Sequence, residues 1–184
     1  MGHALLTKLL LPTLLQTVKL PGADVRVVNV SSMGHRLAVS QGIVYDQAAL
    51  EQTATWRRYG CSKLANILHA KGLALHYPQI TAVSLHPGVI LTDLYSSMRT
   101  NVFLNVGLWL YSWVGMVLPG HYPSADGGAL TQTWAATCEK GELVNGGFYT
   151  PVGVESGGSA LARDGGLRDR LWEWTERELE KHGY

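Results

Sequence analysis

A short run of β-branched residues near the amino terminus constrains the fold most strongly. Four valines occupy residues 25–30. The run is too short for a helix, and it lacks the alternation of apolar and polar residues typical of a strand with one wet face, so it predicts a buried strand of a parallel sheet. Ser31, Ser32 and Gly34 follow it and mark the end of this strand.

The segments around this run alternate between helical and extended patterns. Apolar residues at helical spacing predict helices over 4–18, 56–76, 124–136 and 167–182, and short apolar runs predict strands over 81–85 and 148–152. Residues 35–55 show no sustained period and predict a long loop with one helical turn. This alternation is typical of an α/β protein with a doubly wound parallel sheet. We expect one domain over residues 1–184, with about three strands plus flanking helices.

Such a sheet would be incomplete. Three strands make a narrow sheet, and its first edge would expose residues 25–30 unless something pairs with them. A long apolar edge is an aggregation hazard. The pattern therefore favours missing sequence or an obligate partner.

Composition excludes several classes of protein. Hydrophobic residues make up 46% of the chain and charged residues 16%, which predicts a globular protein. Lys and Arg together number 15 against 14 for Asp and Glu, with no basic run, so we expect no nucleic acid partner. Cys61 and Cys138 lie far apart, which favours a reducing, cytoplasmic location. Lys8 and Pro12 interrupt the leucine run near the amino terminus, which argues against a signal peptide.

One stretch, residues 102–118, approaches membrane character. It is just short of the roughly 20 apolar residues that a spanning helix needs, and Asn105 and Ser112 lie inside it. We expect a lid or substrate-pocket helix here. Membrane spanning and membrane-surface contact through 102–118 are weaker alternatives.

Tyr59 and Lys63 stand four residues apart on the helix predicted over 56–76, and hence on one face of it. An ammonium group beside a phenol favours the phenolate by charge attraction, so the pair could exchange a proton with a substrate. The pattern alone is a weak signal. Its context strengthens it, because the preceding strand ends at Ser32 and open parallel sheets bind ligands at the carboxyl ends of their strands.

Three ordered segments carry a resemblance to a known family. They are RVVNVSS, YGCSKLAN and SLHPGVILTDL, and in this order they resemble the short-chain dehydrogenase/reductase family. The flanking segments LLTKLLLPTLL and LWEWTERELE resemble its retinol-dehydrogenase-like branch found in fungi, so the resemblance covers essentially the entire chain. It implies the carboxy-terminal half of a Rossmann-like fold.

The resemblance also implies roles for individual residues. Tyr59 would be the general acid/base, Lys63 would favour the phenolate and hydrogen-bond the nicotinamide ribose, and Ser32 would hydrogen-bond the substrate oxygen. Ser31 is the alternative serine, and a hydrogen bond at the strand end would explain it without a ligand. The resemblance thus places Tyr59 and Lys63 both in the catalytic set and in the cofactor-binding set.

The segment after the predicted strand 81–85 would contact the nicotinamide end of the cofactor through Pro87, Gly88, Ile90 and Thr92. A Pro-Gly turn followed by a helix cap at Thr92 or Asp93 explains the same letters without a ligand.

Two departures from the family pattern stand out. The family opens with a glycine-rich turn that holds the pyrophosphate, and no GxxxGxG segment occurs in these 184 residues. The supporting asparagine of the family would fall just before Met1. The resemblance therefore implies that the amino-terminal nucleotide-binding half is missing.

The implied function is an NAD(P)-dependent oxidoreductase that interconverts a carbonyl and a primary or secondary alcohol of a small apolar substrate. NADP is the expected cofactor, with NAD as the alternative. A second interpretation is a non-catalytic remnant that pairs with a full-length relative, or a homodimer, through the helices over 4–18 and 56–76. NADPH binding with turnover distinguishes the enzyme from the remnant.

Other chemistries find less support. No GxSxG, HExxH or P-loop motif occurs, and His69 and His76 are seven residues apart, too far to share a zinc ion as an i,i+4 pair, so we expect no metal. A hydrolase built on Ser32, His86 and Asp93 lacks any feature that would orient the three residues.

Overall fold

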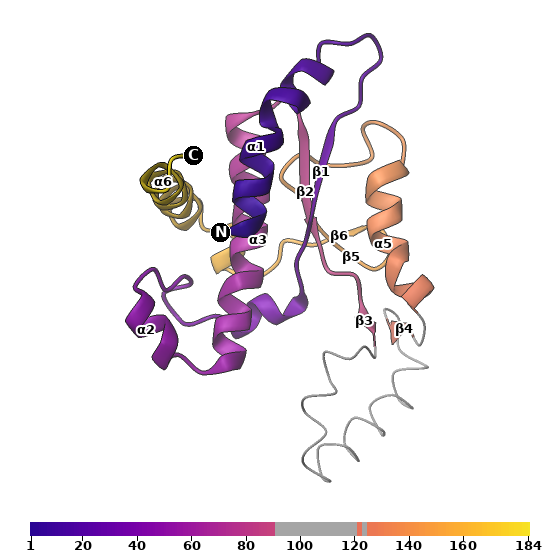
Figure 1. Cartoon of the computed structure of the whole chain (residues 1–184). Helices are drawn as coiled ribbons and strands as arrows, with labels where there is room; N and C mark the ends of the chain where they lie inside the picture. The colour runs from indigo at the N-terminus through magenta and orange to yellow at the C-terminus, as the bar shows by residue number, and fades with distance from the viewer. Residues whose placement is uncertain (91–120, 123–124) are drawn as a thin grey trace.

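The computed structural model of the chain describes residues 1–90, 121–122 and 125–184 (Figure 1). Thr92, Asp93, Ser124 and the apolar stretch 102–118 lie outside the described residues.

The main sheet has four strands in the order β1-β2-β5-β6. The strands β1 (Arg26–Val30) and β2 (Thr81–Leu85) run parallel, and β2 runs parallel to β5 (Phe148–Thr150). These are the three predicted strands. The short β6 (Val154–Glu155) is antiparallel to β5.

The expectation of a purely parallel sheet with about three strands is therefore wrong at one edge. The segment predicted as one strand over 148–152 turns back after Thr150 and adds β6. Gly153 in this turn has φ +70°, a conformation that favours glycine. A second, two-stranded sheet pairs β3 (Val89–Ile90) with β4 (His121–Tyr122) in parallel.

The helices follow the predicted pattern within about two residues at each end. They are α1 (Gly2–Thr17), α3 (Thr55–His76), α5 (Ala125–Thr137) and α6 (Gly165–Lys181). The 3₁₀-helix η1 (Met33–Leu37) extends into the segment 35–55 predicted as a loop with one turn, and α2 (Gln47–Gln52) lies within it. A further 3₁₀-helix, η3 (Leu161–Arg163), precedes α6. Side-chain caps account for three of these starts, because Ser32 accepts from Gly34 N, Asp46 from Ala49 N and Asp164 from Leu167 N.

Helices cover both faces of the main sheet, with α3 on one face, α6 packed against α3, and α5 on the opposite face (Figure 1). Two apolar clusters form the core. Phe148 of β5 joins Leu64 and Ile67 of α3 on one face, while its neighbour Tyr149 packs with Val83 and Ala135 on the other. This is the alternation of side chains that a strand imposes.

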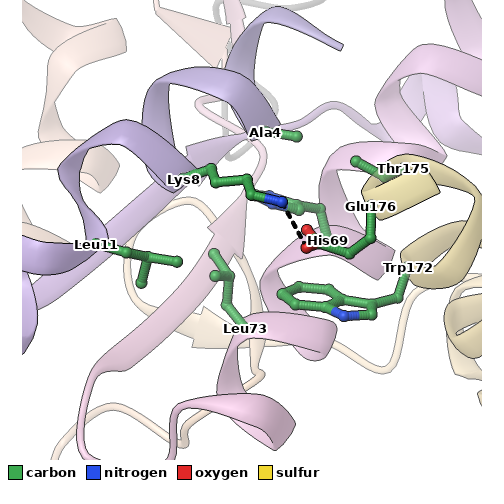
Figure 2. A pocket seen from close by; sticks show the side chains of 8 residues that line it. All are labelled: Ala4, Lys8, Leu11, His69, Leu73, Trp172, Thr175 and Glu176. Carbon is green, nitrogen blue, oxygen red and sulfur yellow. Dashed lines mark hydrogen bonds and ion pairs between the residues drawn. The ribbon is translucent and has the colours of Figure 1, made fainter. Parts of the chain in front are cut away.

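The helix α1 adjoins both α3 and α6. Its Ala4, Lys8 and Leu11 line a small pocket with residues of those two helices (Figure 2). An ion pair of 2.7 Å between Lys8 and Glu176 spans this junction. The outer face of α1 stays open, with Leu6, Leu9 and Leu10 47% to 60% exposed. The apolar residues of α1 thus surround more of the helix than the one stripe that the sequence predicted.

The strand β1 forms one edge of the main sheet. Within the described residues nothing pairs with its outer side, as the narrow-sheet argument anticipated. Asn29 is buried, but Val30 is exposed and the rest of the strand is half-buried, so the prediction of a fully buried strand is wrong. No helix in the described part of the chain combines the length and apolar character needed to cross a membrane.

Candidate active site

The two serines after β1 have different environments. Ser31 is buried, and its hydroxyl donates a 2.6 Å hydrogen bond to the carbonyl of Lys63. This contact ties the end of β1 to α3. Ser32 is half-buried, and its Oγ accepts a 3.0 Å hydrogen bond from Gly34 N as the N-cap of η1. Because the oxygen accepts in this cap, the hydroxyl proton of Ser32 can be donated elsewhere.

The close packing of η1 on α3 brings Tyr59 beside Ser32. A Cβ added to Gly60 would lie 2.4 Å from Ala38 N, so only glycine permits this approach of the two elements. A Cβ added to Gly34 would lie 2.6 Å from Cε1 of Tyr59 and 3.3 Å from Ser32 Oγ. Gly34 therefore lies against both the tyrosine ring and the serine side chain. The ring of Trp56 packs edge-on against Tyr59 at 6.0 Å between centroids.

Lys63 lies on the same side of α3 as Tyr59. Its Nζ is 5.7 Å from the centroid of the Tyr59 ring, and it donates a 3.3 Å hydrogen bond to the carbonyl of Val30. The side chain of Asn66 donates to the same carbonyl at 3.0 Å. Burial lowers the pKa of Lys63 from its ordinary value, because a low-dielectric environment disfavours the ammonium.

The segment after β2 begins at the same edge of the sheet. Val30 is paired in register with Leu85, so both strands reach their carboxyl ends together. Gly88 is buried and has φ +99°, which favours glycine at this position. Pro87 is half-buried before it, whereas Ile90 lies in β3 and not in the predicted loop. Thr92 falls outside the described residues.

The structure also identifies residues that the sequence analysis did not assign. Asn66 donates to the end of β1, and Gly34 lies against both Tyr59 and Ser32. His35 is fully buried in η1 and makes hydrogen bonds to Ser32 and Ser159. The signal available in the sequence was a histidine three residues after the strand-end serine, close enough to fold back onto it.

The pocket in Figure 2 lies elsewhere in the molecule. His69 and Leu73 of α3, Trp172, Thr175 and Glu176 of α6, and three residues of α1 line it. None of the proposed catalytic residues is among them. Within residues 1–90, 121–122 and 125–184, no group of three or more His, Cys, Asp and Glu side chains is arranged to hold a metal ion.

A largely parallel sheet covered by helices on both faces, with polar side chains at the carboxyl ends of its strands, defines an α/β protein that can bind ligands at that edge. Comparison with curated proteins identifies this class of α/β protein more closely. A short-chain dehydrogenase/reductase of Aspergillus calidoustus is 34% identical over 98% of this chain, and an oxidoreductase of Schizosaccharomyces pombe is 34% identical over 100% of it. Retinol dehydrogenase 12 of Mus musculus is 31% identical over 94%. Over almost its whole length the chain is similar to short-chain dehydrogenase/reductases.

The match covers only part of each relative. The chain spans 59%, 54% and 49% of these three proteins and aligns with their carboxy-terminal half. A solved structure, that of an uncharacterized protein from Mycobacterium paratuberculosis, superposes on 91% of this chain and 55% of its own with a TM-score of 0.53 and 25% identity. No protein-family model matches the chain.

Proposed function

We propose that this chain carries the catalytic half of an NAD(P)-dependent oxidoreductase that interconverts a carbonyl and an alcohol. The observation that supports it best is the gathering of Ser32, Tyr59 and Lys63 at the carboxyl end of β1. Gly34 lies against both the Tyr59 ring and the Ser32 hydroxyl, and the Lys63 amine lies 5.7 Å from that ring. The homology to dehydrogenases and reductases supports the same class of reaction.

In the proposed mechanism Tyr59 exchanges the proton with the substrate oxygen. In the reductive direction the phenol donates its proton as negative charge develops on the carbonyl oxygen, and in the oxidative direction the phenolate accepts it. Ser32 donates its hydroxyl proton in a hydrogen bond to the same oxygen and stabilises that charge. The nearby ammonium of Lys63 stabilises the phenolate by charge attraction.

The described residues fit the nicotinamide end of a dinucleotide. A lysine ammonium has three donors, and among the described residues Lys63 donates one hydrogen bond, to the carbonyl of Val30. Two donors are thus available for the ribose hydroxyls, and Pro87 and Gly88 at the neighbouring strand end supply backbone for the nicotinamide. The bound cofactor would supply or accept the hydride. Within this proposal NADP is the preferred cofactor, Ile90 and Thr92 extend the cofactor site, and the substrate is a small apolar carbonyl or alcohol.

Titration with NADPH tests the proposal. We expect saturable enhancement of nicotinamide fluorescence and oxidation of NADPH in the presence of a general aldehyde or ketone. Because the chain spans about half of its relatives, the measurement should be made on the chain and on a fusion that places the amino-terminal half of the Aspergillus relative before it. The fusion should bind more tightly, since a glycine-rich turn can hold the pyrophosphate.

A fusion that binds NADPH yet turns over no carbonyl or alcohol would contradict the proposed enzyme. Absence of binding in both proteins would favour the alternative of a non-catalytic interaction partner. Either this partner or a homodimer would associate through the exposed leucines of α1, which are Leu6, Leu9 and Leu10. Sedimentation of the wild-type chain and of a Leu9→Glu variant would reveal such an association.

Substitution of Ser31 should affect mainly the stability of the chain, and substitution of Ser32 mainly its turnover. Ser31→Ala removes a buried hydrogen bond to Lys63 O and is expected to cost about 1 kcal/mol of unfolding free energy. Ser32→Ala removes the proposed substrate contact and is expected to lower kcat/KM by about 10²-fold or more in the fusion, as for the loss of one oxyanion donor. Urea denaturation and NADPH turnover check the pair. Equal losses of turnover in both variants would contradict the separate roles.

A further inference from the structure

His35 connects the strand-end serine to a distant part of the chain. Its Nδ1 lies 2.7 Å from the carbonyl oxygen of Ser32, and its Nε2 lies 3.0 Å from the backbone nitrogen of Ser159. The ring is fully buried and packs edge-on against Phe148 of β5, with 5.3 Å between centroids. A single imidazole therefore bridges η1, β5 and the segment before η3.

These two contacts define the protonation of the ring. A carbonyl oxygen only accepts, so Nδ1 carries the proton and donates to Ser32, while the backbone N–H of Ser159 only donates, so Nε2 must be the bare acceptor. A second proton on Nε2 would oppose the Ser159 N–H. The described geometry is thus specific for the neutral imidazole with its proton on Nδ1. Burial lowers the pKa of His35 below its ordinary value, which agrees with a neutral ring.

Residues of η1 hold both the carbonyl oxygen and the side-chain oxygen of Ser32. Its carbonyl accepts from the backbone nitrogen of His35 at 3.1 Å and from the His35 ring, and its Oγ accepts from Gly34 N. The ring extends this restraint beyond η1, because its Nε2 accepts a hydrogen bond from the backbone of Ser159. Gly158 beside it has φ +66°, and an added Cβ would approach His35 Nε2 to 3.4 Å, so the segment lies close against the imidazole.

We propose that His35 is a positioning residue that fixes Ser32 at the proposed active site by joining its carbonyl to the backbone of Ser159. The inference relies on the proposed function only for the role of Ser32. The restraint itself can be measured without turnover. Loss of the imidazole contacts should loosen the Ser32 cap even where the core of the sheet stays intact.

Amide hydrogen exchange at Gly34, whose N–H donates to Ser32 Oγ, reports on the cap directly. We expect His35→Phe, which keeps an aromatic ring but neither hydrogen bond, to accelerate Gly34 exchange at least about tenfold. His35→Asn retains a donor near the position of Nδ1 and should restore part of the protection. His69→Phe is the matched control, because it makes the same change at a histidine of α3 that is hydrogen-bonded to Asn29 of β1.

A role in packing alone predicts the reverse order, with Phe protecting Gly34 as well as histidine does and better than Asn. That order would overturn the proposal, as would an unprotected Gly34 in the wild-type chain or an equal acceleration by His69→Phe. A kinetic measurement on the fusion separates this inference from the proposed function. If His35→Phe loosens Gly34 and the wild-type fusion is inactive, the positioning holds and the proposed function fails. If the fusion is active, His35→Phe should lower kcat about tenfold while the affinity for NADPH stays unchanged.

Discussion

Tyr59→Phe is expected to lower carbonyl turnover by about 10²–10⁴-fold, the usual contribution of a general acid/base. The substitution removes one oxygen and keeps the ring that packs on Gly34 and Trp56, so the fold should survive. NADPH oxidation by the fusion protein measures turnover, and fluorescence titration with NADPH measures whether the cofactor still binds.

Matched substitutions within the same helix provide the controls. Tyr77→Phe makes the identical change at the C-cap of α3 and should leave turnover unaltered. Lys63→Met should also abolish turnover. Lys71→Met is its control, because it changes a second lysine of α3 whose pKa is likewise lowered by burial. Full activity of the Tyr59→Phe variant would show that Tyr59 is not the general acid/base. An equal loss of turnover in the Lys63→Met and Lys71→Met variants would indicate that the substitutions act through stability and not through the catalytic step.

Acidification is expected to destabilise the chain strongly through His69. Burial lowers the pKa of this imidazole from 6.5 to about 4, while the unfolded chain retains the ordinary value. The amide Nδ2 of Asn29 lies 3.3 Å from its Nδ1, and the indole of Trp172 stacks at 6.0 Å, so the ring is enclosed on several sides.

The direction of the effect follows from proton binding. Between about pH 6.5 and pH 4 the unfolded chain binds a proton at His69 that the folded chain does not, so the free energy of unfolding falls as the pH falls. The neutral His69 ring therefore contributes fully to the free energy of unfolding above about pH 6.5, and this contribution is lost below about pH 4. A shift of this size corresponds to about 3 kcal/mol.

Urea denaturation of the wild-type chain and of His69→Phe at pH 7, 5.5 and 4 measures this contribution. The variant keeps a ring against Trp172 and has no titrating group, so its stability should depend less on pH by about 3 kcal/mol across the window. Parallel curves for the two proteins would assign the acid sensitivity to other groups and contradict the prediction.

The sequence predicted the fold well where the pattern is local. The valine run before Ser31 and the helical spacing over 56–76 are local patterns, and β1 and α3 each form within a residue or two of the expected bounds. The reversal at Gly153 and the pairing of β3 with β4 were not foreseen. Short strands depend on partners that sequence spacing does not identify.

The candidate site divides in the same way. The i,i+4 spacing of Tyr59 and Lys63 on a helix required only periodicity, and the structure places both on one side of α3. Their approach to Ser32 required two glycines at which no side chain fits, Gly34 and Gly60. The separation of Ser31 from Ser32 also depended on tertiary contact, since one hydroxyl reaches Lys63 O and the other caps η1.

The sequence by itself determined the order of β1, β2 and β5 among the helices α1, α3, α5 and α6, and the side of α3 that carries Tyr59 and Lys63, because both follow from the repeat of the backbone. Tertiary structure alone decided which serine keeps a proton to donate, and that His35 bridges Ser32 to Ser159 across more than a hundred residues. Those contacts join segments remote in the chain, and hydrogen-bond geometry between such segments exists only once the sheet and its helices have packed.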